Sequence, residues 1–144
     1  MIGLECSYEG TLKELFFEIP IDSYYWLISE EEVICRNNSY YPPPRMNKEE
    51  FLERFIKQEN IINFINLQAY LNNTDTTAKI RTYADFEASL CQLIVLISDR
   101  TCWEVYAKDN DLLLRLANNF KKFGCKDLTF KTKNSDIRTV LSVF

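Results

Sequence analysis

Apolar residues recur every three or four positions in several stretches of the chain, a spacing that places them on one face of a helix. The clearest stretches begin after Asn47 and after Asp109, two residue types that cap helix N-termini. The second stretch ends at Gly124, a residue type that commonly stops a helix. Shorter helices are predicted over residues 11–17 and over a stretch that opens with the capping-box pattern Thr82-Tyr83-Ala84-Asp85.

Other stretches alternate apolar and polar residues or are rich in β-branched and aromatic side chains, as strands are. We expect strands at residues 2–6, 24–28, 33–35, 61–71, 90–98, 102–108, 127–132 and 139–144. The stretch 90–98 is almost entirely apolar, which indicates a central strand covered on both faces. The stretch 61–71 fits a strand by its residue types, although its spacing leaves a helix open.

Polar or proline-rich segments predict the connections between these strands. Ser29-Glu30-Glu31-Glu32 is acidic and fits a solvated hairpin turn between the first pair of strands after the N-terminal helix. Asp99-Arg100 is the expected tip of a second hairpin. Residues 37–44 end in three consecutive prolines, which remove three backbone donors and predict an irregular loop.

Together these elements predict one α+β domain over residues 1–144. We expect a largely antiparallel mixed sheet of about five to seven strands, with three to four helices packed on one face. The 144 residues contain no repeat and no Gly/Ser-rich linker, and 47% of them are hydrophobic, which suffices for one core.

The absence of histidine excludes the largest set of chemistries. Without it the chain has no Ser-His or Cys-His nucleophile pair and lacks the commonest general base and metal ligand. The glycine-rich loops that cradle phosphates are also missing. We therefore expect no catalytic residue, no cofactor and no metal, and we expect the carboxylates to be solvated or to complement helix dipoles.

The cysteines form no spacing typical of zinc sites or disulfide frameworks. They are odd in number and widely separated: Cys6, Cys35, Cys91, Cys102 and Cys125. Four lie in apolar or β-branched segments and are interpreted as small hydrophobic residues, whereas Cys125 follows Gly124 in an expected turn, where exposure should be tested. No export signal and no membrane-spanning run is visible, so we expect a cytoplasmic protein.

The charge distribution favours a protein partner over a nucleic acid. The net charge is −4, and an acidic domain repels phosphate backbones but suits a basic protein surface. Residues 121–138 are basic, with six Lys or Arg and two Asp, yet these charges are spread over a helix end, a turn and a strand. Solvated faces are therefore the favoured interpretation of this segment.

A candidate partner-binding surface combines the acidic turn with the tyrosine-proline loop. Tyr and Arg are enriched at protein interfaces, and prolines lower the entropy lost on docking. The candidate residues are Glu30, Glu31, Glu32, Tyr40, Tyr41, Pro42 and Arg45. The competing interpretation is a loop whose tyrosines fold back onto the sheet.

Four segments of the second half resemble an uncharacterised family of short proteins from Bacillus-type bacteria: residues 83–86, 91–99, 104–109 and 135–139. Phe17-Glu18-Ile19-Pro20 and Tyr25-Trp26-Leu27-Ile28 extend the likeness over most of the chain, while the proline loop departs from it. The resemblance implies a bacterial source and carries over no activity and no site.

Two functions remain after these exclusions. The favoured one is a non-catalytic protein-binding module of small acidic type, such as an immunity protein or a counter-defence inhibitor that binds a basic toxin or defence effector. The alternative is a small-ligand binder or an enzyme with a noncanonical site of Arg, Tyr and carboxylates, for which Arg81, Tyr106 and Arg138 are the candidates. A deep pocket that holds two of these three residues would favour the alternative.

Overall fold

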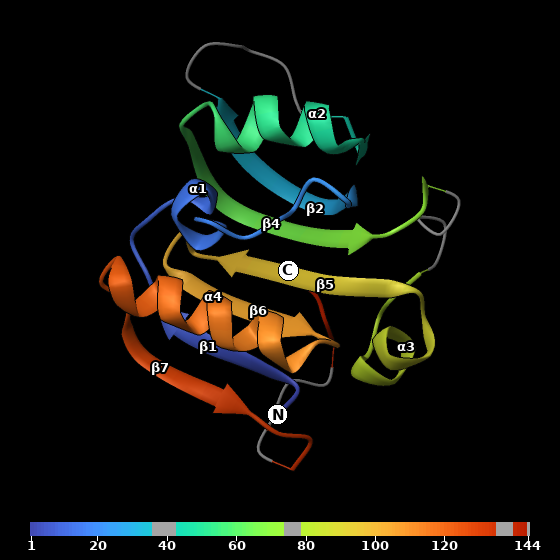
Figure 1. The fold of residues 1–144 in the computed structure, drawn as a ribbon, viewed down its shortest axis with the longest axis vertical. Helices are drawn as coiled ribbons and strands as arrows, with labels where there is room; N and C mark the ends of the chain where they lie inside the picture. Colours follow the sequence, from blue (N-terminus) through green and yellow to red (C-terminus); the bar gives the residue numbers. More distant parts are fainter. Residues whose placement is uncertain (36–42, 74–78, 135–139, 144) are drawn as a thin grey trace.

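A computed structural model describes residues 1–35, 43–73, 79–134 and 140–143. Seven antiparallel strands form one open sheet of order β3-β2-β4-β5-β6-β1-β7 (Figure 1). The strands are β1 (Gly3–Ser7), β2 (Tyr25–Cys35), β3 (Arg45–Met46), β4 (Asn60–Tyr70), β5 (Cys91–Ser98), β6 (Cys102–Ala107) and β7 (Lys126–Lys131). The helices are α1 (Leu12–Leu15), α2 (Lys48–Phe51), the π-helix η1 (Leu52–Ile56), α3 (Tyr83–Ala88) and α4 (Asn110–Lys122).

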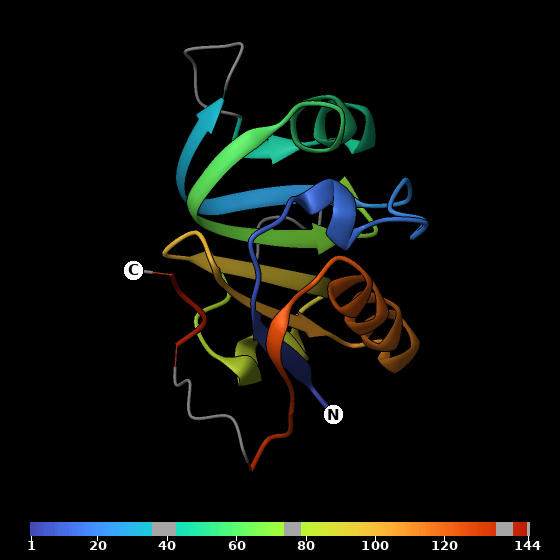
Figure 2. The same cartoon turned by 90° about the vertical axis from the view of Figure 1, so that its left-hand side faces the viewer.

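The predicted α+β class is confirmed, with one difference in the placement of the helices. Helices α1, α2 and α4 lie on one face of the sheet, whereas α3 and residues 140–143 lie on the other (Figure 2). Phe86 of α3 is fully buried against the second face, so this helix covers apolar strand residues that the other helices do not reach.

Strand β5 is the middle strand of the sheet, as its apolar sequence predicts. Leu93, Val95 and Ile97 belong to the core under α1, α2 and α4. Ile94 and Leu96 point to the opposite face, into the core that α3 covers. Both sets are at most 1% exposed, so the strand has no solvated side.

Interlocking aromatic rings fill the core beneath the three helices. The rings of Trp26 and Phe51 stack with centroids 3.9 Å apart and an interplanar angle of 12°. Phe16 meets the Trp26 ring edge-on at 5.6 Å, which ties the segment after α1 to the same cluster. At the other end of this face Tyr8, Trp103 and Phe120 pack edge-on against one another.

Local sequence signals place the helix starts correctly. The side chains of Asn47 and Thr82 each accept a hydrogen bond from the third helical residue in a capping box, and Asp109 caps α4. Gly124 after α4 has a φ of 94°, the left-handed conformation that favours glycine. The segment 61–71 is a strand, which resolves the open alternative for β4.

The predicted hairpin turn at Ser29–Glu32 is wrong. These residues continue β2 as one long strand, and Glu30, Glu31 and Glu32 lie opposite Asn66, Ile65 and Phe64 of β4. Register shifts on either side of this stretch let the two strands stay paired. Strand β4 supplies the backbone hydrogen bonds that keep these residues extended. The sequence of the acidic segment alone contains no sign of this partner.

The predicted C-terminal strand is also wrong for residues 140–143, the part of it that is described. The backbone N–H of Leu141 donates to the carbonyl oxygen of Arg81 at 2.8 Å, and its carbonyl oxygen accepts from Asn66 Nδ2 at 3.2 Å. Leu141 and Val143 are buried against the face that α3 covers. The segment therefore closes a core and adds no strand.

Within the part of the chain that the structure describes, no helix has the length and the apolar character needed to cross a membrane.

Truncating the stacked ring of α2 tests this account of the core. We expect Phe51→Ala to lower the free energy of unfolding by about 3–5 kcal/mol, because Phe51 is fully buried and stacks on Trp26. Urea denaturation followed by circular dichroism measures the loss. The control Leu90→Ala removes a side chain that is 61% exposed and should stay within about 0.5 kcal/mol of the parent. Equal losses in both variants would contradict the account.

Candidate functional site

A cavity of about 540 Å³ opens at one end of the sheet, on the face of α1 and η1. Three segments form it: residues 9–13, which run from the β1–α1 connection into α1, residues 55–62 from η1 into β4, and Arg100, Thr101 and Trp103 at the β5–β6 hairpin. Its volume falls within the range of about 300–1,000 Å³ that is typical of small-molecule sites.

The lining of the cavity combines an apolar floor with a charged rim. Its apolar side chains are Leu12, Phe55, Ile56, Ile61, Ile62 and Trp103. Its charged side chains are Glu9, Lys13, Lys57, Glu59 and Arg100. The largest floor residues, Phe55 and Trp103, are 4% and 2% exposed, so the core itself holds them in place.

The π-helical turn η1 shapes one wall of the cavity. The backbone N–H of Lys57 donates to the carbonyl oxygen of Leu52 at 2.8 Å, which closes a turn wider than that of an α-helix. Asn60 Nδ2 donates to the carbonyl oxygen of Arg54 at 2.5 Å and fixes the passage from η1 into β4. Turns of this kind occur frequently at functional sites.

Arg100 is held rigidly at the opposite wall. Its φ is 66° and that of Asp99 is 49°, so two consecutive residues of the hairpin tip are left-handed. The backbone N–H of Arg100 donates to the Asn63 carbonyl oxygen at 3.0 Å, and its Nε and Nη2 both donate to Asn63 Oδ1, at 3.1 and 3.0 Å. Trp103 Nε1 donates to the Arg100 carbonyl oxygen at 3.2 Å.

The charges of the rim are only partly compensated. Lys57 pairs with Glu53 at 3.6 Å. Lys13, Arg100 and Glu9 form no ion pair with any residue that the structure describes. The rim as a whole is positive, because its five charged side chains are three cations and two carboxylates.

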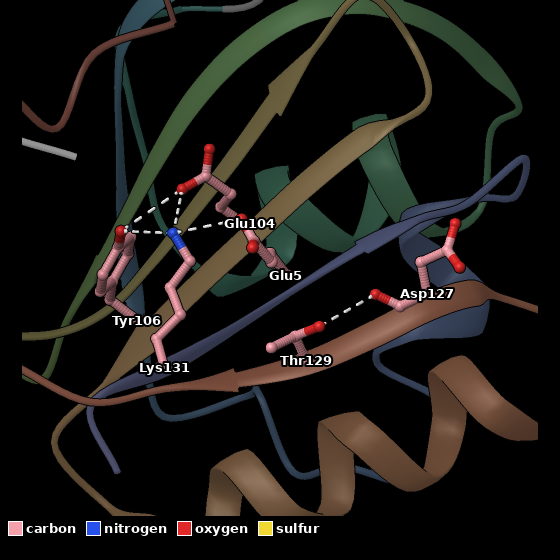
Figure 3. Close-up of polar contacts among 6 residues, drawn as sticks. All are labelled: Glu5, Glu104, Tyr106, Asp127, Thr129 and Lys131. Carbon is pink, nitrogen blue, oxygen red and sulfur yellow. Dashed lines mark hydrogen bonds and ion pairs between the residues drawn. The ribbon is translucent and has the colours of Figure 1, made fainter. Parts of the chain in front are cut away.

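A second polar cluster lies on the other face of the sheet, around the buried amine of Lys131 (Figure 3). Lys131 Nζ lies 2.6 Å from Glu104 Oε2, 3.4 Å from Glu5 Oε2 and 3.1 Å from the Tyr106 hydroxyl. The Tyr106 hydroxyl also donates to Glu104 Oε2 at 3.3 Å. The cluster thus joins β1, β6 and β7 through side chains.

This cluster stabilises the fold and is poorly suited to nucleophilic chemistry. Burial lowers the pKa of Lys131, but the contacts with Glu104 and Tyr106 outweigh burial and raise it above the usual 10.5. The amine therefore stays protonated at neutral pH. Because the pKa in the folded protein is the higher one, the stabilisation is complete below pH 10.5 and is lost as the pH rises through the folded value.

Of the four cysteines predicted to be buried, Cys6 and Cys91 are buried, Cys102 is exposed, and the side chain of Cys35 lies outside what the structure describes. Burial raises the pKa of Cys6 to about 12, with Cys125 as a further cause, and burial raises that of Cys91 to about 11. Both thiols therefore stay protonated at neutral pH. Cys102 is exposed and Cys125 is half-buried, so the expectation that only Cys125 approaches the surface is wrong for Cys102.

Of the predicted partner-binding residues, only Arg45 has a described side chain, and it does not line the cavity. The backbone of Glu30, Glu31 and Glu32 lies in β2, and the positions of their side chains fall outside what the structure describes. Tyr40, Tyr41 and Pro42 also lie outside the described residues. Arg45 is exposed on the edge strand β3, opposite Leu27 of β2.

Of the three residues proposed for a noncanonical site, the two that the structure describes, Arg81 and Tyr106, do not line the cavity. Arg81 is exposed before α3, whereas Tyr106 is fully buried in the Lys131 cluster. Arg138 lies outside the described residues. The sequence predicts Arg100 only as part of a hairpin tip. Asp99-Arg100 is unusual there, because such a tip normally takes Asn-Gly or Asp-Gly, and this departure is the sequence feature that could have marked Arg100 as a functional residue.

Over the described ranges, no three His, Cys, Asp or Glu side chains come together in a group that could hold a metal ion.

Comparison with known proteins gives a family but no activity. The family model described as "Protein of unknown function (DUF2691)" matches residues 2–142. A curated protein of Bacillus subtilis (strain 168), "Uncharacterized protein YncE", is 32% identical over 65 residues, which cover 45% of this chain. The match spans 42% of the relative's length. No solved structure matches this chain. These matches confirm the resemblance inferred from the sequence.

Removing the buried amine tests its structural role. We expect Lys131→Met to cost about 3–5 kcal/mol of unfolding free energy, because it leaves the Glu104 carboxylate, 13% exposed, without its cation. The double variant Lys131→Met/Glu104→Leu should recover most of the loss. The control Lys133→Met breaks a pair with Glu87 that is more than half exposed and should cost at most about 1 kcal/mol. A double variant less stable than Lys131→Met, by urea denaturation, would refute this role.

Proposed function

The chain belongs to the DUF2691 family of unknown function, and we propose that it is a binding protein whose cavity between residues 9–13, η1 and the β5–β6 hairpin holds a small molecule. The observation that carries the proposal is the cavity itself. It has the volume of a small-molecule site, an apolar floor fixed by the core, and polar and charged side chains around that floor.

This proposal takes up the alternative function drawn from the sequence and moves it to other residues. The sequence alone favours a protein-binding module, because the domain is small and acidic and has no recognisable catalytic residues. The cavity supports ligand binding more directly, since its walls are an unusual helical turn and a left-handed hairpin tip that side-chain hydrogen bonds hold in place. Such preorganised walls lower the entropy lost on binding.

A paired set of substitutions in η1 tests the proposal. Ile56 and Leu52 are both half-buried, four residues apart, but only Ile56 lines the cavity. We expect Ile56→Trp to fill the cavity and to abolish the binding of fragments that the parent protein binds. A fragment library screened by amide and indole NMR shifts provides the measurement, with the Trp103 indole as the reporter inside the cavity.

The matched control is Leu52→Trp, which adds the same bulk outside the cavity and should leave fragment binding within about twofold of the parent. Thermal melting shows whether each variant is folded. If no fragment shifts the resonances of cavity residues in the parent protein, or if both variants bind equally well, the cavity is not a binding site.

A second candidate function, protein binding in the manner of an immunity or counter-defence inhibitor, draws support from the edge of the sheet. Strand β3 pairs with β2 only at Trp26 and Leu27. From Ser29 to Cys35, β2 pairs on one side alone within the described residues. An edge of this kind can accept an added strand, and three consecutive glutamates favour a basic partner. A cytoplasmic location is part of this second proposal.

Charge reversal on the edge tests the second candidate. We expect Glu31→Lys to weaken the capture of a basic partner from lysate of the source bacterium by at least about tenfold, because like charges repel at an interface. Quantitative mass spectrometry of the captured proteins measures the change. The control Asp22→Lys makes the same charge change at an exposed site before β2 and should capture normally. Equal capture by both variants would rule out this edge.

A further inference from the structure

We propose that the ligand of the cavity is an amphipathic monocarboxylate, whose apolar body lies on the floor and whose carboxylate meets Arg100 and Lys13. This inference rests on the proposed ligand-binding function and adds the chemical class of the ligand. It uses the geometry of the cavity alone, since the family has no activity to carry over.

The floor of the cavity sets the apolar part of the ligand. Phe55 and Trp103 present rings that the core fixes, and the half-buried isoleucines Ile56 and Ile62 border them. The surface that an apolar ligand can remove from water is mainly that of the half-buried isoleucines, and its burial contributes about 25 cal/mol per Å². An entirely polar ligand would gain little from these walls.

The rim sets the charge of the ligand. Lys13 and Arg100 have no ion-pair partner among the described residues. The charged lining residues are three cations and two carboxylates, Glu9 and Glu59, so the rim carries one positive charge on a chain whose net charge is −4. A group with one negative charge balances this rim. A phosphate monoester carries about −1.5 to −2 at neutral pH and would leave excess charge beside Glu9.

The fixed orientation of Arg100 favours a carboxylate over a diffuse anion. Asn63 Oδ1 accepts from Nε and Nη2, which uses two of the five guanidinium donors and fixes the plane of the group. The backbone of Arg100 is fixed as well, because its N–H donates to the Asn63 carbonyl oxygen and its carbonyl oxygen accepts from Trp103 Nε1. A planar guanidinium held in this way still has donors for the planar oxygens of a carboxylate.

Titrations with three probes of equal chain length test the inference. Octanoate, octanol and octyl phosphate share the apolar body and differ in the head group. We expect octanoate to bind most tightly, with shifts at the Trp103 indole and the Arg100 side chain in NMR spectra. Octanol should bind at least about tenfold more weakly, because it lacks a charge-assisted hydrogen bond.

Variants of the two cations identify the carboxylate site. Arg100→Gln and Lys13→Gln should each weaken octanoate by at least about tenfold and leave octanol unchanged. Glutamine at position 100 must adopt the same left-handed backbone conformation that arginine adopts there. Position 13 has an ordinary backbone conformation, so Lys13→Gln introduces no backbone strain. The control Lys48→Gln removes an exposed charge outside the cavity and should bind octanoate like the parent.

The outcomes separate this inference from the function on which it rests. If octanol or octyl phosphate binds as tightly as octanoate, or if both cation variants bind octanoate normally, the carboxylate assignment is wrong although the cavity still binds ligands. If no probe and no library fragment shifts the cavity resonances, the proposed function fails as well.

Discussion

Both faces of the sheet must be shielded from water, and this requirement determines where the helices and the C-terminal segment lie. The three middle strands carry apolar side chains on both sides, so one layer of helices leaves half of the core open to water. Helix α3 and residues 140–143 close the second side, and Leu141 is anchored there by backbone bonds to Arg81 and Asn66. The covering elements leave one end of the sheet hollow, where the cavity lies.

Local signals made much of this fold predictable. Asn47, Thr82 and Asp109 each start a helix because a cap acts within three residues of itself. The continuous strand through Glu30–Glu32 was missed because its stability comes from β4, about 30 residues further along the chain. The cavity was missed for the same reason, since segments from both halves of the chain build it and no segment alone contains a recognisable motif.

The two most informative cations of the molecule differ in how their charge is compensated. Lys131 is buried, and Glu104, Glu5 and Tyr106 surround it, so its charge serves the cohesion of β1, β6 and β7. Arg100 is exposed and bonded to the neutral side chain of Asn63, so its position is fixed while its charge is not neutralised. This difference separates a structural cation from one suited to bind an external anion.

The π-helical turn also bears on how this cavity can change during evolution. A π-turn holds one more residue between its hydrogen-bonded groups than an α-turn does, so loss of a single residue within Leu52–Ile56 would restore an α-helix. The helical residues after the deletion would then rotate by about 100° around the helix axis. A deletion of one codon would thus change which side chains of this segment face the cavity. Relatives with and without that codon would form a natural series of sites with different linings.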